Sequence, residues 1–308
     1  MADDPNYLLA QTGESPYGWP WIWSGTEWHG TGNRPSSGVQ LCFARPIEKV
    51  DPRDYRQFSY PEPGPQMPVK VKNQDGKGAC NGHAAATTLE MARWVAGMTP
   101  VDLSAWFVYA ILCNGIDQGS SIDDALDLLT KTGTCPETDV PYGTINPRSL
   151  TDQSRRDASR YKIEIGTKLV TWDDLMSATM LGRPFNFSIC VGGNFNNLDS
   201  NGVVGYTSGY GNHAVSGGWG AKPIGGGEWA IRWQNSWGAT WGQRGFAYFT
   251  RQHWEKQQYA TAYDLVAVTD DPQDPEPFPV PRLAYEMQGV ETPCSDKSTF
   301  YIPRTLNG

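Results

Sequence analysis

The character of the chain changes at Pro184, and this change restricts the fold more than any other feature. Between residues 80 and 182 apolar residues recur with helical spacing and the predicted helices end at glycines. After Pro184, short runs of alternating apolar residues predict strands. Helices followed by strands predict an α+β fold with two lobes, a helical lobe at about 80–150 and an antiparallel, β-barrel-like lobe at about 165–268. We expect a functional site in the cleft between the lobes.

The predicted elements have clear local end signals. A helix is expected from Cys80 to about residue 96, before Gly97, and another from Ser121, whose hydroxyl is expected to cap it, to Lys131. The remaining predicted helices cover residues 104–113 and 171–182, and the predicted strands cover residues 185–191, 214–219, 229–234, 246–250 and 261–268.

The composition divides the chain into three parts. Residues 1–45 are rich in Trp, Gly and Pro without a helical period, which predicts an arm that packs on the main body or on a partner. Residues 46–268 are the predicted main domain, and residues 269–308 begin with an Asp/Pro run that predicts an extended tail. Extended ends are typical of assembly subunits, so the sequence leaves open a structural or binding role in a larger assembly such as a virus particle, with protein partners on the arm and tail.

Charge and cysteine spacing exclude several classes of function. The formal net charge of −8 and the lack of a long basic run argue against a nucleic-acid partner. The start of the chain lacks a secretory pattern and the apolar run 105–112 is too short to span a bilayer, which predicts a cytoplasmic location or incorporation in an assembly. The six cysteines form no C-x-x-C pair, so we expect no metal and no cofactor. A Cys113–Cys135 disulfide is left open.

Cys80 lies where a helix is predicted to begin. The unpaired N–H groups and the positive end of the helix dipole favour a thiolate at that position. Gln74 lies six residues earlier, and its side-chain amide could donate to the oxyanion that forms when a thiolate attacks a carbonyl. This pattern indicates nucleophilic chemistry at Cys80, provided that a base lies close by.

His213 is the best of the four histidines for this base. It follows a glycine-rich loop at the entry to a predicted strand, where small neighbours leave the ring accessible. His83, on the same helix as Cys80, is the alternative, but it would compete for the buried face of that helix. Asn235 ends an apolar strand and could accept the far N–H of the imidazole, while the indole of Trp237 could keep water from that bond.

Three sequence blocks give a resemblance to a known family. They are Val-Lys-Asn-Gln leading to Gly-Ala-Cys at Cys80, Asn-His-Ala-Val at His213, and Asn-Ser-Trp-Gly-Ala-Thr-Trp-Gly from Asn235. In order and spacing the chain resembles the papain family of cysteine peptidases over roughly residues 46–268, with His213 and Asn235 lying 133 and 155 residues after the cysteine.

The resemblance implies a two-lobe papain-like fold and an endopeptidase that hydrolyses peptide or protein substrates through a thioester. It implies the following roles: Cys80 as nucleophile, His213 as general base and acid, Asn235 as the orienting group, Gln74 and the N–H of Cys80 as the oxyanion hole, and Trp237 and Trp241 as supporting residues.

The chain also departs from the family pattern on both sides of Cys80. Lys77 stands where the family usually has a cysteine, and Asn81 stands where it usually has an aromatic residue. A charge at Lys77 would lower the pKa of the thiol if its side chain pointed inward. The arm also lacks the charged, helical composition of the family's propeptides. We therefore expect this protein to differ from its relatives around Cys80.

Overall fold

The structure is a computed structural model, and it describes residues 21–23, 28–30, 32–34, 41, 47–258 and 260–268. Most of the expected arm at residues 1–45 and all of the expected tail at residues 269–308 lie outside the described residues, as do the partner contacts predicted for them. Within the arm, β1 (Trp21–Trp23) pairs antiparallel with β2 (Trp28–Gly30). This short hairpin was not predicted from the sequence, which showed only the lack of a helical period there.

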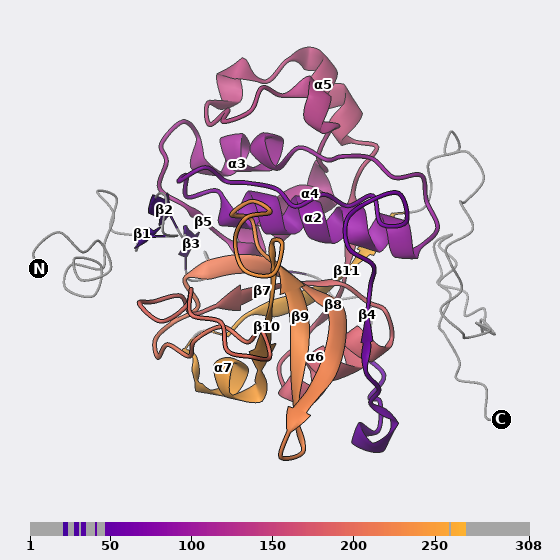
Figure 1. Cartoon of the computed structure of the whole chain (residues 1–308). Helices are drawn as coiled ribbons and strands as arrows, with labels where there is room; N and C mark the ends of the chain where they lie inside the picture. Colours follow the sequence, from indigo (N-terminus) through magenta and orange to yellow (C-terminus); the bar gives the residue numbers. More distant parts are fainter. Residues whose placement is uncertain are drawn as a thin grey trace, which may run out of the picture.

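The helical lobe consists of α2 to α5, which lie above the sheet in Figure 1. Ser104 and Ser121 cap α3 and α4, accepting hydrogen bonds from the backbone N–H groups of Phe107 and Asp124. The cap predicted at Ser121 is therefore confirmed. The helices are α2 (Cys80–Val95), α3 (Ala105–Cys113), α4 (Ile122–Lys131) and α5 (Asp152–Ala158), and the 3-10 helices are η1 (Pro52–Asp54), η2 (Glu137–Asp139) and η3 (Pro147–Ser149).

A seven-stranded sheet forms the second lobe. Six strands follow one another in the order β10-β9-β8-β7-β11-β6, each antiparallel to its neighbours, and β4 pairs with β8. The strands are β4 (Phe58–Ser59), β6 (Ile163–Lys168), β7 (Phe185–Ile189), β8 (His213–Gly225), β9 (Glu228–Gln234), β10 (Phe246–Thr250) and β11 (Ala262–Ala267). The predicted α+β fold with an antiparallel second lobe is confirmed, and the sheet of this lobe does not close into a barrel. Closing a barrel requires the two end strands to pair, and β10 and β6 are at opposite ends of the pairing order.

Helix α2 joins the two lobes because it is buried on every side. Its residues from Cys80 to Trp94 are all buried. Leu89 of α2 belongs to the same apolar cluster as Leu126 of α4 and Leu265 of β11, so the helix packs on helices and sheet at once. Each such buried leucine contributes about 1.5–3 kcal/mol to the free energy of unfolding. The first residue of α2 is therefore held firmly at the boundary between the lobes.

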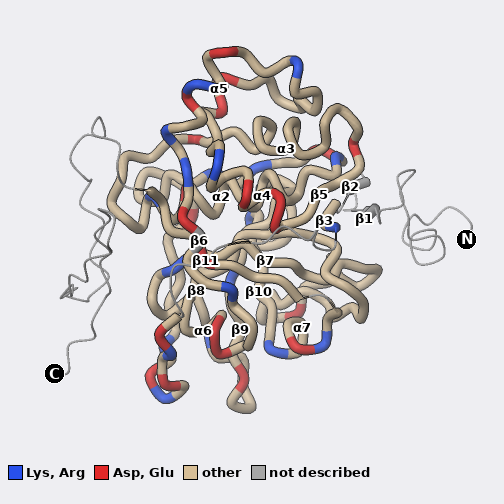
Figure 2. Tube along the Cα trace, turned by 180° about the vertical axis from the view of Figure 1, so that it is seen from behind, with Lys and Arg blue, Asp and Glu red and all other residues tan. Residues whose placement is uncertain are grey.

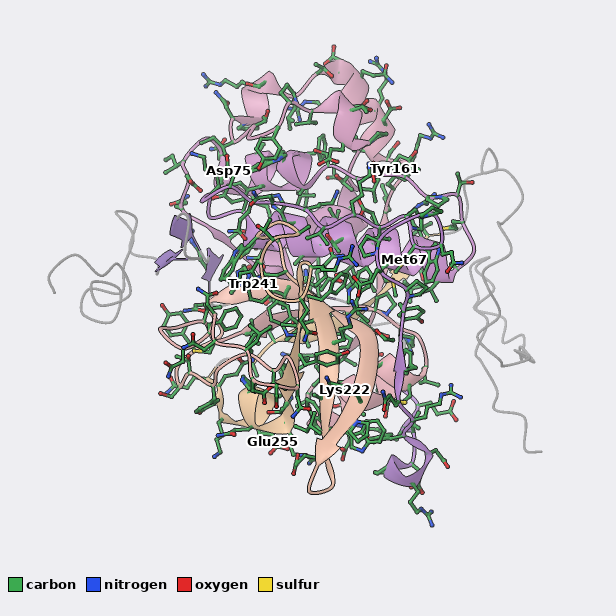
Figure 3. All side chains as sticks on the ribbon, in the orientation of Figure 1. Met67, Asp75, Tyr161, Lys222, Trp241 and Glu255 are labelled. Carbon is green, nitrogen blue, oxygen red and sulfur yellow. The ribbon has the colours of Figure 1, made fainter. Side chains whose placement is uncertain are left out.

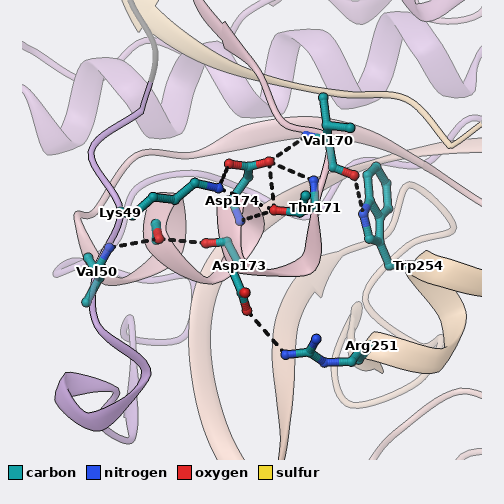
Figure 4. A network of polar contacts seen from close by, with 9 residues as sticks. Lys49, Val50, Val170, Thr171, Asp173, Asp174, Arg251 and Trp254 are labelled. Carbon is teal, nitrogen blue, oxygen red and sulfur yellow. Dashed lines mark hydrogen bonds and ion pairs between the residues drawn. The ribbon is translucent and has the colours of Figure 1, made fainter.

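Two further helices, α6 (Trp172–Met180) and α7 (Arg251–Lys256), pack against the sheet away from the helical lobe (Figure 1). Figure 4 shows the polar network that anchors them. The Thr171 hydroxyl and the Asp174 carboxylate form a capping box at the start of α6, and Lys49 pairs with Asp174. The indole N–H of Trp254 donates to the carbonyl of Val170 over 3.0 Å, which links α7 to the same corner.

Charged residues are spread over the helical lobe, the loops and some of the strands (Figure 2). Acidic and basic residues of the described part are interspersed, and β7 and β10 carry neither kind (Figure 2). Among the described residues no helix is long and apolar enough to cross a bilayer. The parts of the sheet that position the site are thus held by apolar packing and strand pairing.

Candidate active site

His213 and Asn235 are held together by neighbouring strands. His213 is the first residue of β8 and pairs with Ile189 of β7, while Asn235 directly follows β9. The imidazole Nε2 lies 2.7 Å from the side-chain oxygen of Asn235. Because an amide oxygen only accepts, Nε2 must carry the hydrogen, which leaves Nδ1 of a neutral ring free of a proton. Both residues are buried.

An aromatic cluster covers this histidine. The ring of Trp237 lies 4.8 Å from the imidazole ring of His213, and Trp241 packs edge-on against Trp237 at 5.4 Å. Trp241 lies at the level where the helices meet the sheet (Figure 3), and its N–H donates to the side chain of Asn196 over 2.8 Å. Trp237 therefore contacts the imidazole directly, whereas Trp241 supports Trp237.

Gln74 is fixed by contacts to the segment after Asn235. Its side-chain oxygen accepts from the hydroxyl of Ser236 at 2.8 Å and from the indole of Trp237 at 3.1 Å. Its side-chain nitrogen donates to the carbonyl of Lys77 at 2.6 Å, within the loop that leads to Cys80. The amide nitrogen of Gln74 is thus directed into the loop before the cysteine, and its orientation is set by the sheet lobe.

Cys80 lies at the first turn of α2 and its side chain is completely buried. Burial raises the pKa of the thiol to about 12, while the backbone N–H groups of Ala214 and Asn81 partly oppose this by hydrogen bonding to the sulfur. Cys80 also belongs to the same buried apolar cluster as Ala214, the residue after His213. The helix start favours a thiolate, whereas burial of the side chain favours the neutral thiol.

The sequence that carries these residues also matches the model of a known protein family. The sequence profile described as papain family cysteine protease matches residues 55–267. The chain belongs to the papain family of cysteine proteases. Among curated proteins it is similar to the cathepsin B-like CP2 of Giardia intestinalis, with 29% identity over 225 residues that cover 67% of this chain and 74% of that protein.

Solved structures show the same fold. Xylellain, a cysteine protease from Xylella fastidiosa, superposes with a TM-score of 0.63 and 21% identity, covering 78% of this chain and 97% of its own. Procathepsin B S9 from Trypanosoma congolense superposes with a TM-score of 0.59 and 14% identity, covering 86% of this chain and 99% of its own. These likenesses confirm the two-lobe papain-like fold.

Two ionisable residues near Cys80, Lys77 and His83, have contacts within the helical lobe. Lys77 is half-buried, and its ammonium nitrogen lies 4.0 Å from the carboxylate of Asp117. His83 is buried, its Nδ1 lies 2.9 Å from the carbonyl of Ala79, and its ring packs edge-on against Trp106. Burial lowers the pKa of His83 to about 4, so this ring is neutral at pH 7. Both side chains are occupied in packing the helical lobe.

The other cysteines of the described part are not bonded to one another. Cys80, Cys113, Cys135 and Cys190 are all free thiols, so the Cys113–Cys135 disulfide that the sequence left open is absent here. The sulfur of Cys113 instead lies 3.2 Å from the carbonyl of Ile145. Burial raises the pKa of each of these thiols, most strongly for Cys80 and Cys135.

One part of the site was missed by sequence reasoning. The strand β3 (Asn33–Arg34) pairs in parallel with β5 (Ser120–Ser121) of the helical lobe, and Gly32 forms an antiparallel bridge with His213. A three-residue piece of the arm therefore lies between the lobes, at the level of Cys80. The unusual Asn81 was the one available signal, because it is the residue that reaches this piece of the arm.

Proposed function

We propose that this papain-family protein is an endopeptidase that hydrolyses peptide bonds through a thioester on Cys80. The observation that supports this best is the 2.7 Å bond between His213 and Asn235, which leaves the unprotonated Nδ1 of the ring as the base. The proposal is also supported by the packing of Cys80, which belongs to the same buried apolar cluster as Ala214, the residue after His213. A nucleophile, a base and an orienting group are thus brought together from α2, β8 and the end of β9.

In the first step, His213 removes the proton from the thiol of Cys80, and the sulfur attacks the carbonyl carbon of a peptide bond. Forming the ion pair from a neutral thiol and imidazole requires stabilisation, which Asn235 supplies by accepting the Nε2–H of the imidazolium. Trp237 limits the access of water to that bond. The imidazolium then donates its proton to the departing amine, and the thioester remains on Cys80.

The negative charge that develops on the carbonyl oxygen needs donors that are already in place. The side-chain nitrogen of Gln74 and the backbone N–H of Cys80 fill this role in the proposal, since Ser236 and Trp237 fix the orientation of the Gln74 amide. In the second step, His213 takes a proton from water, the hydroxide adds to the thioester, and the carbon–sulfur bond breaks. The second product is a carboxylic acid, and the thiol of Cys80 is regenerated.

Hydrolysis of peptides blocked at both ends tests this proposal, because only an endopeptidase cleaves them. We expect the full chain to cleave such peptides, and Cys80→Ala and His213→Ala each to lower kcat/KM by a factor on the order of 10⁴ or more. His253→Gln is a matched control, since it changes another buried histidine of the sheet lobe, and it should stay within about 2-fold. Cleavage at an unchanged rate by Cys80→Ala would remove the proposal.

A further inference from the structure

The piece of the arm between the lobes is bound by backbone contacts on both sides. The N–H of Ser120 donates to the carbonyl of Gly32 over 2.8 Å on the helical side. The N–H of Asn33 donates to the carbonyl of Asn212 over 3.0 Å on the sheet side, directly before His213. A chain held in this way adds a strand between the two lobes, which is a common mode of peptide binding.

The arm lies so close to the loop before Cys80 that glycine is needed at the points of contact. Gly32 has a φ of +72°, and a Cβ at this position would collide with the carbonyl of Gly78 in the loop before Cys80. A Cβ at Gly119 would likewise collide with the carbonyl of Gly32. The backbone of the arm thus lies in van der Waals contact with the loop that leads to the nucleophile, and Cys80 is completely buried in this arrangement.

Both the nitrogen and the oxygen of the Asn33 side-chain amide have hydrogen-bond partners. Its nitrogen donates to the carbonyl of Gly211 over 2.6 Å, and its oxygen lies 3.3 Å from the side-chain nitrogen of Asn81. Asn33 is buried, with 3% of its surface exposed, so these bonds are made without competition from water. The two partners come from different lobes, one from the loop before β8 and the other from α2.

The side chain of Asn81 is held in an orientation in which it can bind an amide group. Its side-chain nitrogen also donates to the backbone carbonyl of Ser120 at 2.5 Å and lies 3.3 Å from the Ser120 hydroxyl, which fixes the plane of the group. Its side-chain oxygen is buried and has no hydrogen-bond partner among the residues that the structure describes. A buried acceptor without a partner costs about 1–3 kcal/mol, so the site retains a hydrogen-bonding capacity that Asn33 does not use.

We propose that Asn81, Ser120 and the carbonyl of Gly211 form a site selective for the side chain of asparagine. Asn33 occupies this site in the free chain, and an asparagine of a bound peptide takes the place of Asn33. The proposal that a peptide substrate binds here rests on the proposed peptidase function. The proposal that Asn33 occupies the site does not, because it concerns contacts within the folded chain. We call these three residues the amide site.

The amide site distinguishes asparagine from similar side chains by chemistry and length. Aspartate would place an ionised oxygen against the carbonyl of Gly211, where two acceptors repel each other and no donor is present. Alanine would leave that buried carbonyl and the Asn81 nitrogen with one partner fewer. Glutamine is one methylene longer. Asn33, Asn81 and Ser120 are only 0–4% exposed, so the longer side chain would fit only if neighbouring residues shifted.

Alkylation of Cys80 by iodoacetamide, followed by mass spectrometry of the cysteine peptides, tests the part played by Asn33. We expect Asn33→Ala to speed the alkylation of Cys80 in the full chain by about tenfold or more, since one buried hydrogen bond fewer favours release of the arm. Asn197→Ala is the matched control, because it makes the same change on the surface, and it should leave the rate within about 2-fold. The buried Cys113 and Cys190 report unfolding in the same digest.

The selectivity of the amide site for asparagine is tested by adding peptides to the Asn33→Ala protein. A synthetic peptide with the sequence of residues 28–38 should protect Cys80 from alkylation, and the same peptide with aspartate in place of asparagine should protect at least about tenfold less well. In hydrolysis of blocked peptides, an asparagine scanned along the peptide should raise kcat/KM by about tenfold at one position. Asn81→Ala should bring the ratio for asparagine over alanine peptides close to 1, a change that a merely structural role would not produce.

Equal alkylation of Cys80 in the wild-type chain and Asn33→Ala would overturn the proposal, and so would equal protection by the asparagine and aspartate peptides. If Asn33→Ala exposes Cys113 and Cys190 as well, Asn33→Asp carries the same test, because aspartate keeps the size of the side chain and loses the donor to Gly211. Absence of any hydrolysis, together with the expected alkylation pattern, would remove the peptidase function and leave the amide site standing.

Discussion

The two sides of the candidate active site are built in different ways. On the sheet side, His213 and Asn235 are positioned by strand register, and Trp237 packs on the imidazole ring. On the helix side, Cys80 and Asn81 begin a helix whose surroundings include buried amides, a buried ion pair and a piece of the distant arm. Strand pairing holds the first side, while individual polar contacts hold the second.

This difference separates what the chain shares with its family from what is its own. The sheet side consists of the family blocks, and it has the geometry that those blocks imply. The helix side carries the departures, and there the structure buries the sulfur and raises its pKa to about 12. The chemistry proposed for the site thus rests on the family blocks, whereas the proposed control of access to the cysteine involves Asn81, where the chain departs from the family pattern.

The largest expected effect on stability is on the helix side. Lys72 lies in the segment before the Gln74 loop, and its ammonium group lies 2.9 Å from the carboxylate of Glu90 in α2, with both side chains at most 5% exposed. Glu90→Ala leaves this cation buried without its main partner and should lower the free energy of unfolding by about 3–5 kcal/mol. Urea denaturation measures the change.

A matched control for that change lies on the sheet side. Arg232 of β9 pairs with Glu62, whose side chain is 46% exposed. Solvent screens this pair, so Glu62→Ala should lower the free energy of unfolding by about 1 kcal/mol or less. Equal losses for Glu62→Ala and Glu90→Ala would contradict the view that the helix side depends on buried polar contacts.

An intermediate effect is expected for Asn235→Ala. The change removes the acceptor that fixes the tautomer of His213, but the strand that carries the histidine stays paired with β7. Because a hydrogen bond of this kind contributes about 1–3 kcal/mol, kcat should fall by about 10- to 100-fold while KM changes little. Steady-state kinetics on a blocked peptide measure both values. A large rise in KM with unchanged kcat would show that Asn235 binds substrate instead of orienting the base.

The smallest expected effect is a change in the pH dependence of stability. Burial lowers the pKa of His83 from 6.5 to about 4. Between these values the unfolded chain takes up a proton that the folded chain does not, so this residue makes the free energy of unfolding fall as the pH falls from about 6.5 towards 4. In His83→Gln the fall between pH 7 and pH 5 should be shallower than in the wild-type chain. Parallel curves for the two proteins would contradict the assignment of a buried neutral ring.

Local signals made much of the fold predictable from the sequence. Ser121 caps its helix as predicted, because a cap is decided by residues within one turn. The strand β6 and the open form of the sheet were not predicted. They depend on pairing between Ile163–Lys168 and the distant β11, and such pairing leaves little trace in either segment alone.

The candidate site shows the same division. The residues Cys80, His213 and Asn235 stand in recognisable blocks, so their proximity could be expected. The contacts of Gly32 with Gly78 and of Asn33 with Asn81, on either side of Cys80, could not, because Gly32 and Asn33 are almost 50 residues earlier in the chain. Asn81 was noted as unusual, but its partner Asn33 became visible only in three dimensions.

The central claim is that Cys80 forms a thioester with the substrate, and trapping that intermediate tests it most directly. The full chain is mixed with a blocked peptide, the reaction is stopped with acid during turnover, and the cysteine peptides are weighed by mass spectrometry. We predict that the peptide containing Cys80 gains the mass of the acyl part of the substrate, and that this adduct is absent in Cys80→Ala. Turnover with no adduct on Cys80, or with the acyl group on another residue, would contradict the account.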